Sequence, residues 1–398
     1  MPEAFLVGGA RTPVGRYGGA LSPVRPDDLA ALVVKEAVQR AGIPSSSVDE
    51  VILGNANGAG EENRNVARMA WLLAGFEDSV PGITVNRLCA SGMSAIIMAS
   101  HMIKAGAADV VVAGGVESMS RAPWVMAKPT TAFAKPGDAF DTSIGWRFVN
   151  PIFQAQEKTT YSMPETAEEV ARIDGITRED ADAFAAGSQE KALAAIAAGR
   201  FADEIVPVTV KTRKGETVVD TDEGPREGTT AEVLAGLKPV VTGGSVVTAG
   251  NASSLNDGAS AIVVASEAAI QKYGLTARAR IADGASAGVP APIMGIGPVP
   301  ATHKVLDRTG WALDEIGAVE LNEAFATQSL ACIRRLGLDP SIVNNDGGAI
   351  ALGHPLGSSG SRIAITLLGR MEREGADKGL ATMCVGVGQG TALLLERV

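Results

Sequence analysis

The chain has 398 residues, 46% of them hydrophobic and 4% aromatic, with 47 glycines and a formal net charge of −10. This length and apolar content allow a large core in two or more domains, and small aliphatic residues with many glycine turns favour an α/β protein. The negative charge argues against nonspecific nucleic-acid binding, and the chain shows neither an apolar run of membrane-spanning length nor a basic-then-apolar signal segment at its N-terminus.

The first informative segment in chain order ends at a cysteine. An apolar run at 83–85 predicts a strand, and small and apolar residues from about Ser91 to Lys104 predict a helix, so Cys89 stands at a helix N-terminus. Unpaired backbone N–H groups and the helix dipole favour a thiolate at such a position. Most free cysteines are buried small hydrophobes, so this position alone leaves a nucleophile and a core residue equally open.

A long segment, about 117–256, interrupts the pattern of strands and helices. It contains Pro-rich loops at 123–164, an amphipathic helical region at 165–200 and a charged, hairpin-like segment at 206–222. An insertion of this length usually forms a lid over a binding site or an oligomer contact. We expect a solvated charged face for the cations of the hairpin-like segment, which are Lys211, Arg213 and Lys214.

Asn322 stands where a predicted strand ends and a predicted helix begins. The carboxyl ends of parallel strands are where α/β proteins place their ligand sites. Asn322 is therefore either a helix N-cap or a donor to an oxyanion or a water, and the sequence alone does not separate the two. Cys332, in the middle of the following apolar helix, is expected to pack in the core.

His354 lies in the glycine-rich loop 347–357, directly before a helix that we expect from about Ser358. Glycines allow a substrate to approach the backbone closely, and Pro355 fixes the exit of the loop. A neutral imidazole there can accept the proton of Cys89. Of the other two histidines, His101 is expected to be structural within an apolar helix, and His303 is expected to be exposed.

Cys384 follows a predicted strand at 380–383 and precedes Gly386 and two further glycines. Such a run leaves backbone N–H groups free to point at an oxyanion, and a thiol with an unperturbed pKa of roughly 8.5 can move protons near neutral pH. The three cysteines have no C-x-x-C spacing and cannot all pair within one chain. We therefore expect a reduced, cytoplasmic protein without a structural metal.

Two parts of the chain repeat one another. Arg40 and Gly92 lie in segments that match those of Arg308 and Gly360 at the same spacing of 268 residues. Each copy reads strand, helix, strand, helix, strand, which predicts right-handed βαβ units and a mostly parallel sheet. The expected domains are an N-terminal half at 1–116 plus 257–275, an inserted loop domain at 117–256 and a C-terminal half at 276–398.

Taken together, six segments resemble the thiolase family, and the likeness runs from end to end of the chain. Several motifs in the correct order are far more specific than any single one. The resemblance implies a thiolase-like duplicated five-layer α/β/α/β/α fold with an inserted loop domain, in agreement with the repeat. The matching segments are Asn86–Gly92, Gly114–Ser120, Thr248–Ser253, Asn322–Phe325, Gly353–Pro355 and the glycine run after Cys384.

The resemblance also implies a ping-pong reaction. Cys89 would attack the keto carbon of a 3-oxoacyl-CoA, and Cys384 would protonate the carbanion of the departing acetyl-CoA. A second CoA, deprotonated by His354 or Cys384, would then release the shortened acyl-CoA from Cys89. The enolate oxygen would be held by His354 and a water on Asn322, and the tetrahedral oxyanion by the N–H groups of Cys89 and Gly386.

Contacts to CoA are implied by the same resemblance. Ser253 would contact the pantetheine arm, Arg226 the adenine-nucleotide end, and Met163 and Phe325 complete the assigned CoA-binding residues. No cofactor is expected to be tightly bound and no metal is expected, because CoA and acyl-CoA are substrates. The resemblance further implies a homo-oligomer, a dimer or a tetramer, held through the insertion, and neither nucleic acid nor membrane is an expected partner.

The segments 140–151 and 163–168, together with Val387, look most like β-ketoadipyl-CoA thiolases. Biosynthetic acetoacetyl-CoA thiolases usually carry His-Met-Gly where Ser162-Met163-Pro164 stands, so an acetyl-CoA C-acetyltransferase is the second interpretation. A dicarboxylate tail needs a cation, and Arg147 is either that cation or a structural arginine of a lid loop.

Thiolases usually have Asn where Asp346 stands. An ionised Asp cannot donate a hydrogen bond as Asn does, so Asp346 either caps the turn or disturbs the His354 loop.

Two other functions compete. A decarboxylating ketoacyl synthase shares the fold and a cysteine at a helix start, but it typically uses a His–His or His–Asn pattern, and the second cysteine, Cys384, favours a thiolase. A non-catalytic acyl-CoA-binding protein belongs to a different class. It would have no need for Cys89, His354, Asn322 and Cys384 together.

Overall fold

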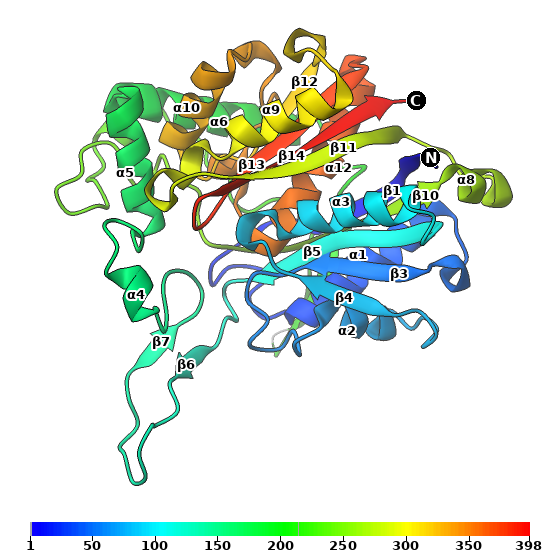
Figure 1. Ribbon diagram of the computed structural model, residues 1–398, viewed down its shortest axis with the longest axis horizontal. Coiled ribbons are helices and arrows are strands. Elements are labelled where there is room, and N and C mark those ends of the chain that lie inside the picture. The colour runs from blue at the N-terminus through cyan, green and yellow to red at the C-terminus, as the bar shows by residue number, and fades with distance from the viewer. Residues whose placement is uncertain (1, 214) are drawn as a thin grey trace.

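The computed structural model describes residues 2–213 and 215–398. Within these residues the main element is a mixed sheet of 10 strands, in which β2 (Gly15–Arg16) pairs only with β10 (Figure 1). The other strands follow one another across the sheet in the order β12 (Ala318–Leu321), β13 (Lys378–Val385), β14 (Gln389–Arg397), β11 (Ala279–Gly288), β1 (Ala4–Arg11), β10 (Asn256–Ser266), β5 (Val110–Ser118), β3 (Glu50–Gly54) and β4 (Gly82–Val85).

The two halves of this sheet have the same strand order and the same strand directions. In the first half β4, β3 and β5 run parallel, and β10 and β1 follow antiparallel. In the second half β12 and β13 run parallel, β14 and β11 follow antiparallel, and Val343 bridges β12 in the place that β4 occupies in the first half. An antiparallel pair of β1 and β11 joins the halves, so the structure has the internal repeat that the sequence indicates.

The prediction of a mostly parallel sheet is wrong. Only three residues, 386–388, separate β13 from β14, and a connection this short can join only antiparallel neighbours. Within this turn Val387 and Gly388 have φ values of 61° and 76°. The strand after the insertion, β10, likewise returns antiparallel to β5.

Two equivalent helices fill the space between the sheet halves. α3 (Ser91–Lys104) and α12 (Leu356–Glu374) pack against each other and against strands of both halves (Figure 1). They approach closely at glycines: a Cβ on Gly92 would lie 2.6 Å from Ser361 Oγ, and one on Gly360 would lie 2.7 Å from Met93 Cβ. The N-termini of both helices are therefore brought together in the middle of the molecule.

Helices also cover the two outer faces. The first half is covered by α1 (Pro26–Ala41) and α2 (Val66–Leu73), and the second half by α9 (Pro298–Thr309) and α10 (Ala326–Leu336). Separate apolar clusters form beneath each outer layer and around the central helices. The expected five-layer α/β/α/β/α arrangement is confirmed.

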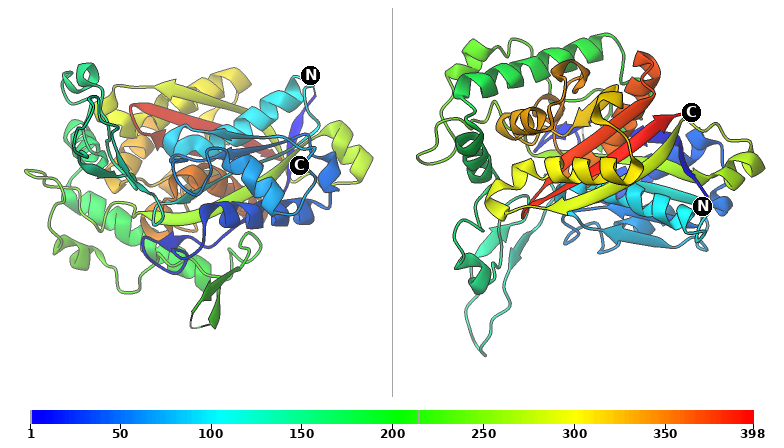
Figure 2. Two further views of the ribbon diagram at one scale, coloured as in Figure 1. Left: turned by 90° about the horizontal axis from the view of Figure 1, so that it is seen from below. Right: turned by 45° about the horizontal axis from the view of Figure 1, so that its top comes forward.

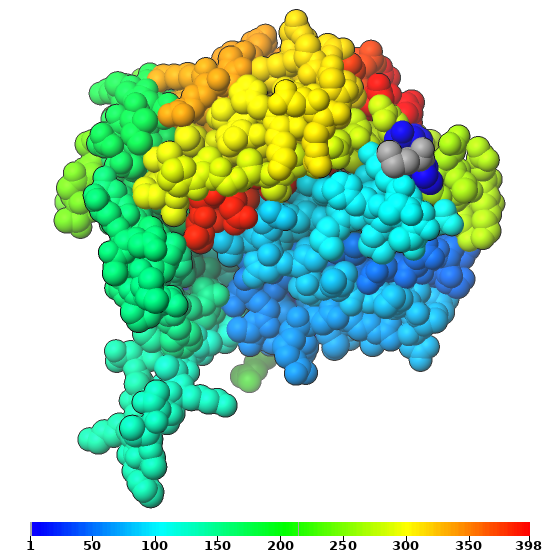
Figure 3. Space-filling view, in the orientation of Figure 1, coloured from blue at the N-terminus to red at the C-terminus, as the bar shows by residue number. Residues whose placement is uncertain are grey.

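Much of the segment between β5 and β10, including α4 and α5, lies at the end of the molecule away from both termini (Figure 1 and Figure 2), whereas Val206, Val208 and Val210 pack in the core of the first half. An arm formed by β6 and β7 protrudes from this end (Figure 3), and β8 and β9 form the charged hairpin, whose Lys211 pairs with Glu216. Lys214 lies outside the described residues. The elements of this segment are β6 (Trp124–Met126), β7 (Ala139–Asp141), α4 (Pro151–Gln154), α5 (Met163–Asp174), α6 (Arg178–Ala197), β8 (Val208–Thr212), β9 (Gly215–Val219) and α7 (Ala231–Ala235).

The division of the chain into an N-terminal half, an inserted loop domain and a C-terminal half stays a prediction. None of the helices in the described ranges combines the length and apolarity that a membrane crossing requires.

The remaining helical elements are short: η1 (Ser45–Ser47), η2 (Leu88–Ala90), α8 (Glu267–Tyr273), η3 (Ala291–Ile296), η4 (Leu313–Glu315), η5 (Pro340–Ile342) and α11 (Ala349–Leu352).

Candidate active site

Cys89 lies in η2, which links β4 to the start of α3, as the sequence predicts. The residue before it, Leu88, has a φ of 47°, a conformation that costs free energy for a branched side chain. Two neighbours hold this turn: Leu88 N–H donates to Asn86 Oδ1 (2.8 Å), and Ser91 Oγ donates to the Leu88 carbonyl (2.7 Å). The strained backbone at Leu88 and these two hydrogen bonds therefore fix the position of Cys89, which is 8% exposed.

The surroundings of the Cys89 sulfur favour the protonated thiol over the thiolate. Burial raises its pKa to about 11, although the backbone N–H groups of Gly386 and of Cys89 itself favour the thiolate. The N–H groups thus act in the direction expected from the helix position, and burial acts against them. Burial destabilises the thiolate more than the N–H groups stabilise it. The thiol therefore has to lose its proton as the sulfur attacks.

His354 lies between α11 and α12 and is 5% exposed. Its Nδ1 atom lies 2.6 Å from Ser359 Oγ, and the Ser359 hydroxyl donates to the Pro355 carbonyl (2.9 Å). Because the hydroxyl proton is used there, Ser359 Oγ accepts from Nδ1–H, and this network assigns the lone pair to Nε2. Burial and Arg362 lower the pKa of His354 to about 3, so the imidazole is a neutral base.

Asn322 follows β12 and is fully buried. The residue at the N-cap position of α10 is Phe325, so Asn322 is not a helix N-cap. Its Nδ2 atom lies 3.4 Å from Nε2 of His354, while its Oδ1 atom has no hydrogen-bond partner among the residues that the structure describes. A buried amide oxygen without a protein partner can accept from a small polar molecule or a water.

Glu323 is a buried carboxylate for which the sequence analysis proposed no role of its own. It accepts from Ser188 Oγ (2.6 Å), Asn344 Nδ2 (2.8 Å) and the N–H of Ile350 (3.2 Å). These bonds tie the end of β12 to α11, the helix that leads to His354. The available signal was an acidic residue directly after a buried strand, but its partners are far away in the sequence.

Glu117, at the end of β5, is the second residue that sequence reasoning missed. Its carboxylate accepts from the N–H groups of Ala56 (2.9 Å), Asn57 (3.2 Å) and Gly357 (2.8 Å). It thereby joins the loop after β3 to the start of α12. Burial raises the pKa of Glu117 to about 7. The signal in the sequence is a charged residue directly after an apolar run, but its hydrogen-bond partners lie far away along the chain.

Cys384 lies near the end of β13 and is fully buried. Its side chain belongs to an apolar cluster that includes Met163, Met294 and Phe325. Burial raises the pKa of Cys384 well above its usual value, and the nearby Cys89 raises it further. The N–H of Gly386, two residues after Cys384, faces the sulfur of Cys89, so the end of β13 brings Cys384 into the neighbourhood of Cys89.

A cavity of about 620 Å³ opens beside Cys89. Cys89 and Gly386 lie on its wall, together with Leu356, two residues after His354. His354, Asn322 and Cys384 are buried and do not form part of this wall. Two stretches of the insertion, 142–147 and 160–165, also line the cavity.

The four residues assigned to CoA differ in position. Met163 lies on the wall of the cavity, and Phe325 is buried in the cluster around Cys384. Ser253 is half-buried, and its N–H donates to the Ala324 carbonyl (3.0 Å) beside Phe325. Arg226 is exposed and is not on the wall, so the structure does not bring it to the cavity.

Asp346 neither caps a turn through its side chain nor leaves its charge unpaired. Its carboxylate is 1% exposed and forms ion pairs with Arg200 (2.8 Å) and with Arg373. The negative charge at this position is thus compensated by two guanidinium groups.

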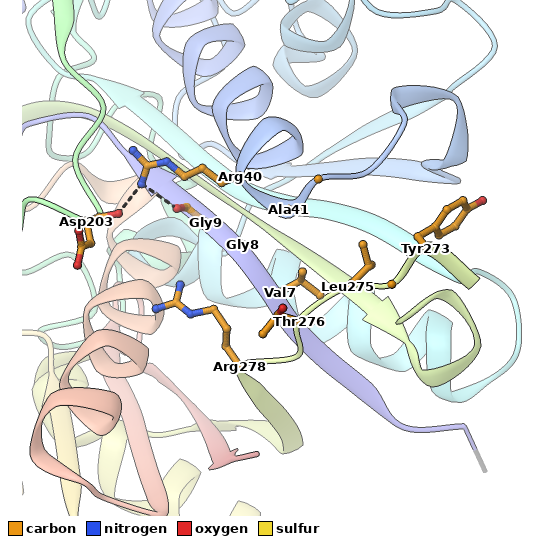
Figure 4. A pocket seen from close by; sticks show the side chains of 12 residues that line it. Val7, Gly8, Gly9, Arg40, Ala41, Asp203, Tyr273, Leu275, Thr276 and Arg278 are labelled. Atoms are coloured by element: carbon orange, nitrogen blue, oxygen red, sulfur yellow. Dashed lines mark hydrogen bonds between the residues drawn. The ribbon is translucent and has the colours of Figure 1, made fainter. Parts of the chain in front are cut away.

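The remaining candidates have ordinary surroundings. His101 lies within α3, as expected, where its side chain is exposed and lies 3.6 Å from Asp283. His303 is exposed and Cys332 is fully buried, as expected. A separate cavity of about 310 Å³ contains Arg40 and Arg278, whose guanidinium groups already bind backbone carbonyls and Glu372, so it offers no free cation (Figure 4).

Comparison with known proteins matches the whole chain. The family model described as "Thiolase, N-terminal domain" matches residues 4–268, and "Thiolase, C-terminal domain" matches 275–397. The β-ketoadipyl-CoA thiolase of Pseudomonas aeruginosa is 57% identical over 100% of this chain and 99% of its own length. The 3-oxoadipyl-CoA/3-oxo-5,6-dehydrosuberyl-CoA thiolase of Escherichia coli K12 is 54% identical, with 100% of both chains covered.

An acetyl-CoA acetyltransferase of Pseudomonas aeruginosa is 48% identical over 100% of both chains. Solved structures are also similar: those of Bacillus anthracis acetyl-CoA acetyltransferase and human mitochondrial 3-ketoacyl-CoA thiolase both have a TM-score of 0.93. Their sequence identities are 44% and 39%, and in each case 100% of this chain and 99% of the other are covered. This chain belongs to the thiolase family of acyltransferases.

Proposed function

We propose that the chain cleaves a 3-oxoacyl-CoA with CoA, giving acetyl-CoA and a shortened acyl-CoA, and that 3-oxoadipyl-CoA is its substrate. The observation that carries the reaction is a buried Cys89 on the wall of a mainly apolar cavity, where the N–H of Gly386, two residues after Cys384, faces its sulfur. The choice of substrate is supported by the relatives named for 3-oxoadipyl-CoA, which share 54–57% identity with the whole chain.

In the first step the sulfur of Cys89 forms a bond to C3 of the substrate. Its proton passes to Nε2 of His354, which is neutral and carries the free lone pair. The C3 oxygen becomes an oxyanion, and the N–H groups of Cys89 and Gly386 are the donors assigned to it. A single donor of this kind can contribute roughly 3–4 kcal/mol to stabilising the transition state.

Next the C2–C3 bond breaks, the oxyanion re-forms a carbonyl as an acyl thioester on Cys89, and the electron pair leaves as the enolate of acetyl-CoA. Its oxygen faces the Nε2–H that His354 has just gained and a donor held by the unpaired Oδ1 of Asn322. Cys384 then gives its proton to C2. A thiol with a strongly raised pKa keeps its proton until a much more basic carbanion is beside it.

The second half returns the enzyme to its starting state. The sulfur of CoA attacks the acyl carbon and gives its proton to the Cys384 thiolate, or to His354 once His354 has passed its own extra proton to that thiolate. The Cys89–acyl bond breaks, and Cys89 regains the proton that His354 then holds. The mainly apolar wall around Cys89 keeps water from competing with CoA.

The test is a panel of substrates assayed with CoA: acetoacetyl-CoA, a long linear 3-oxoacyl-CoA and 3-oxoadipyl-CoA. We expect 3-oxoadipyl-CoA to be cleaved with the highest kcat/KM, giving acetyl-CoA and succinyl-CoA, and Cys89→Ala to remove this activity. If only acetoacetyl-CoA is cleaved or formed, the acetyltransferase interpretation replaces the substrate assignment. If no 3-oxoacyl-CoA is cleaved, the proposed reaction is wrong.

We also infer a cytoplasmic homo-oligomer, a dimer or a tetramer, without a tightly bound cofactor. The protruding arm supports the oligomer, because Trp124 is 74% exposed and Met126 and Phe133 are exposed as well. Light scattering after gel filtration should give a mass of two or four chains. A single chain at micromolar concentration would reject this inference.

A further inference from the structure

The segment 142–147 of the insertion is held firmly beside the cavity. At one end Asn57 Nδ2 donates to Thr142 Oγ1 (2.8 Å), and the Thr142 hydroxyl donates to the Pro123 carbonyl (2.6 Å). At the other end Trp146 Nε1 donates to the Tyr161 carbonyl (3.2 Å). Side chains of this segment are therefore presented to the cavity from a tethered backbone, as a binding residue requires.

Arg147 is the next residue along this segment, and it lines the same cavity as Cys89. It is half-buried, and its guanidinium donates only a long hydrogen bond, from Nη1 to the Gly145 carbonyl (3.4 Å). In the parts of the chain that the structure describes, no carboxylate forms an ion pair with it. A guanidinium against a mainly apolar wall is best satisfied by an anion that binds there.

The other charges on the wall are already occupied. The carboxylate of Glu117 accepts three backbone N–H groups. Glu165 accepts from both the N–H and the hydroxyl of Ser162, as part of the cap of α5. Neither carboxylate is directed to Arg147, so the unsatisfied charge of the wall is positive.

We propose that Arg147 binds the terminal carboxylate of a dicarboxylic 3-oxoacyl-CoA and so determines specificity for it. This inference rests on the proposed function and assigns the feature that separates 3-oxoadipyl-CoA from a neutral acyl chain of the same length. The same guanidinium can meet another anion, a phosphate of CoA. The two sources differ in their consequences, since every substrate carries the CoA phosphates and only dicarboxylic substrates carry the second carboxylate.

The experiment compares 3-oxoadipyl-CoA with 3-oxohexanoyl-CoA, which has the same six-carbon acyl chain and ends in a methyl group. The variants are Arg147→Met, which keeps an unbranched side chain without the charge, and Arg147→Lys, which keeps the charge. Arg172→Met is the matched control, because it removes one positive charge from an exposed position paired with Glu169. The readouts are kcat/KM for both substrates and the KM for CoA.

We expect Arg147→Met to lower kcat/KM for 3-oxoadipyl-CoA about 10- to 100-fold and to change that for 3-oxohexanoyl-CoA less than about 3-fold. Arg147→Lys should recover part of the selectivity, and Arg172→Met should leave the ratio unchanged. The ratio of the two substrates is insensitive to the fraction of folded enzyme.

Equal losses on both substrates would overturn the proposal, and equal losses with a raised KM for CoA would assign Arg147 to a CoA phosphate instead. If the unmodified enzyme cleaves neither substrate, the proposed function fails together with this inference. If it cleaves both and Arg147→Met leaves their ratio unchanged, the thiolase reaction stands and only the role of Arg147 is rejected.

Discussion

Nε2 of His354 lies 3.4 Å from Nδ2 of Asn322, at the point where two loops from the second half of the fold meet. The amide faces the nitrogen that, in the tautomer set by Ser359, holds the lone pair. The same nitrogen is a base when Cys89 attacks and, once protonated, a donor to the enolate. One imidazole can thus serve both purposes in sequence.

Replacing Ser359 tests this tautomer. In Ser359→Ala the buried Nδ1–H loses its acceptor, so the ring is no longer held with its lone pair on Nε2, and we expect kcat to fall about 10- to 100-fold. Ser361→Ala is the control on the same helix, because Ser361 bonds to Ser260 and not to His354. Steady-state kinetics at saturating substrate measure both, and similar losses in the two variants would contradict the assignment.

The raised pKa of Cys89 predicts how the thiol reacts. With a pKa of about 11, the thiolate fraction grows about tenfold for each pH unit up to that value. The rate of alkylation of Cys89 by iodoacetamide should therefore still be rising at pH 9. Peptide mass spectrometry separates its rate from those of Cys332 and Cys384, which are fully buried and should react far more slowly. A rate that levels off below pH 8 would show that a thiolate is present at rest.

The close contact of α3 and α12 predicts a difference between two glycines of one helix. A Cβ on Gly360 would lie 2.7 Å from Met93 Cβ, whereas one on Gly369 meets only the end of the Arg373 side chain. We expect Gly360→Ala to lower the free energy of unfolding by about 1–3 kcal/mol. Gly369→Ala should be neutral or raise it by about 0.5–1 kcal/mol, since alanine is the better helix former. Thermal unfolding of both variants measures this, and equal stabilities would contradict the packing.

The pairing of Asp346 predicts the effect of restoring the residue usual in the family. In Asp346→Asn two guanidinium groups lose their counter-ion, and we expect the free energy of unfolding to fall by about 1 kcal/mol. The loss is moderate because Arg200 and Arg373 are 41% and 37% exposed and are screened by solvent. Combining Asp346→Asn with Arg373→Met should recover part of it. A more stable single variant would show that the carboxylate is not compensated.

The sequence alone predicted the features that depend on local pattern and on repetition. The equivalence of Gly92 and Gly360 in the sequence indicated two matching halves. In the structure the helices that contain these two glycines pack against each other. The sequence analysis did not predict that β14 runs antiparallel to β13. The short turn after Val385 implies this direction, but the prediction used only the alternation of strands and helices and not the length of the connection.

Features that depend on distant contacts could not be read from the chain. The protonation of Cys89 is decided by burial beneath elements from both halves, which no local segment reveals. Glu117 and Glu323 act through hydrogen bonds to residues that lie close only after folding. Met163 lies on the wall of the cavity and the exposed Arg226 does not, and the contact of Met163 with CoA stays a prediction.

The central claim is that Cys89 carries the acyl group between the two halves of the reaction. The most direct measurement is mass spectrometry of the enzyme quenched after mixing with 3-oxoadipyl-CoA in the absence of added CoA. We predict a succinyl group on the peptide that contains Cys89, lost again when CoA is added before the quench. Turnover without any acyl group on that peptide, or acylation of a different residue, would contradict the account.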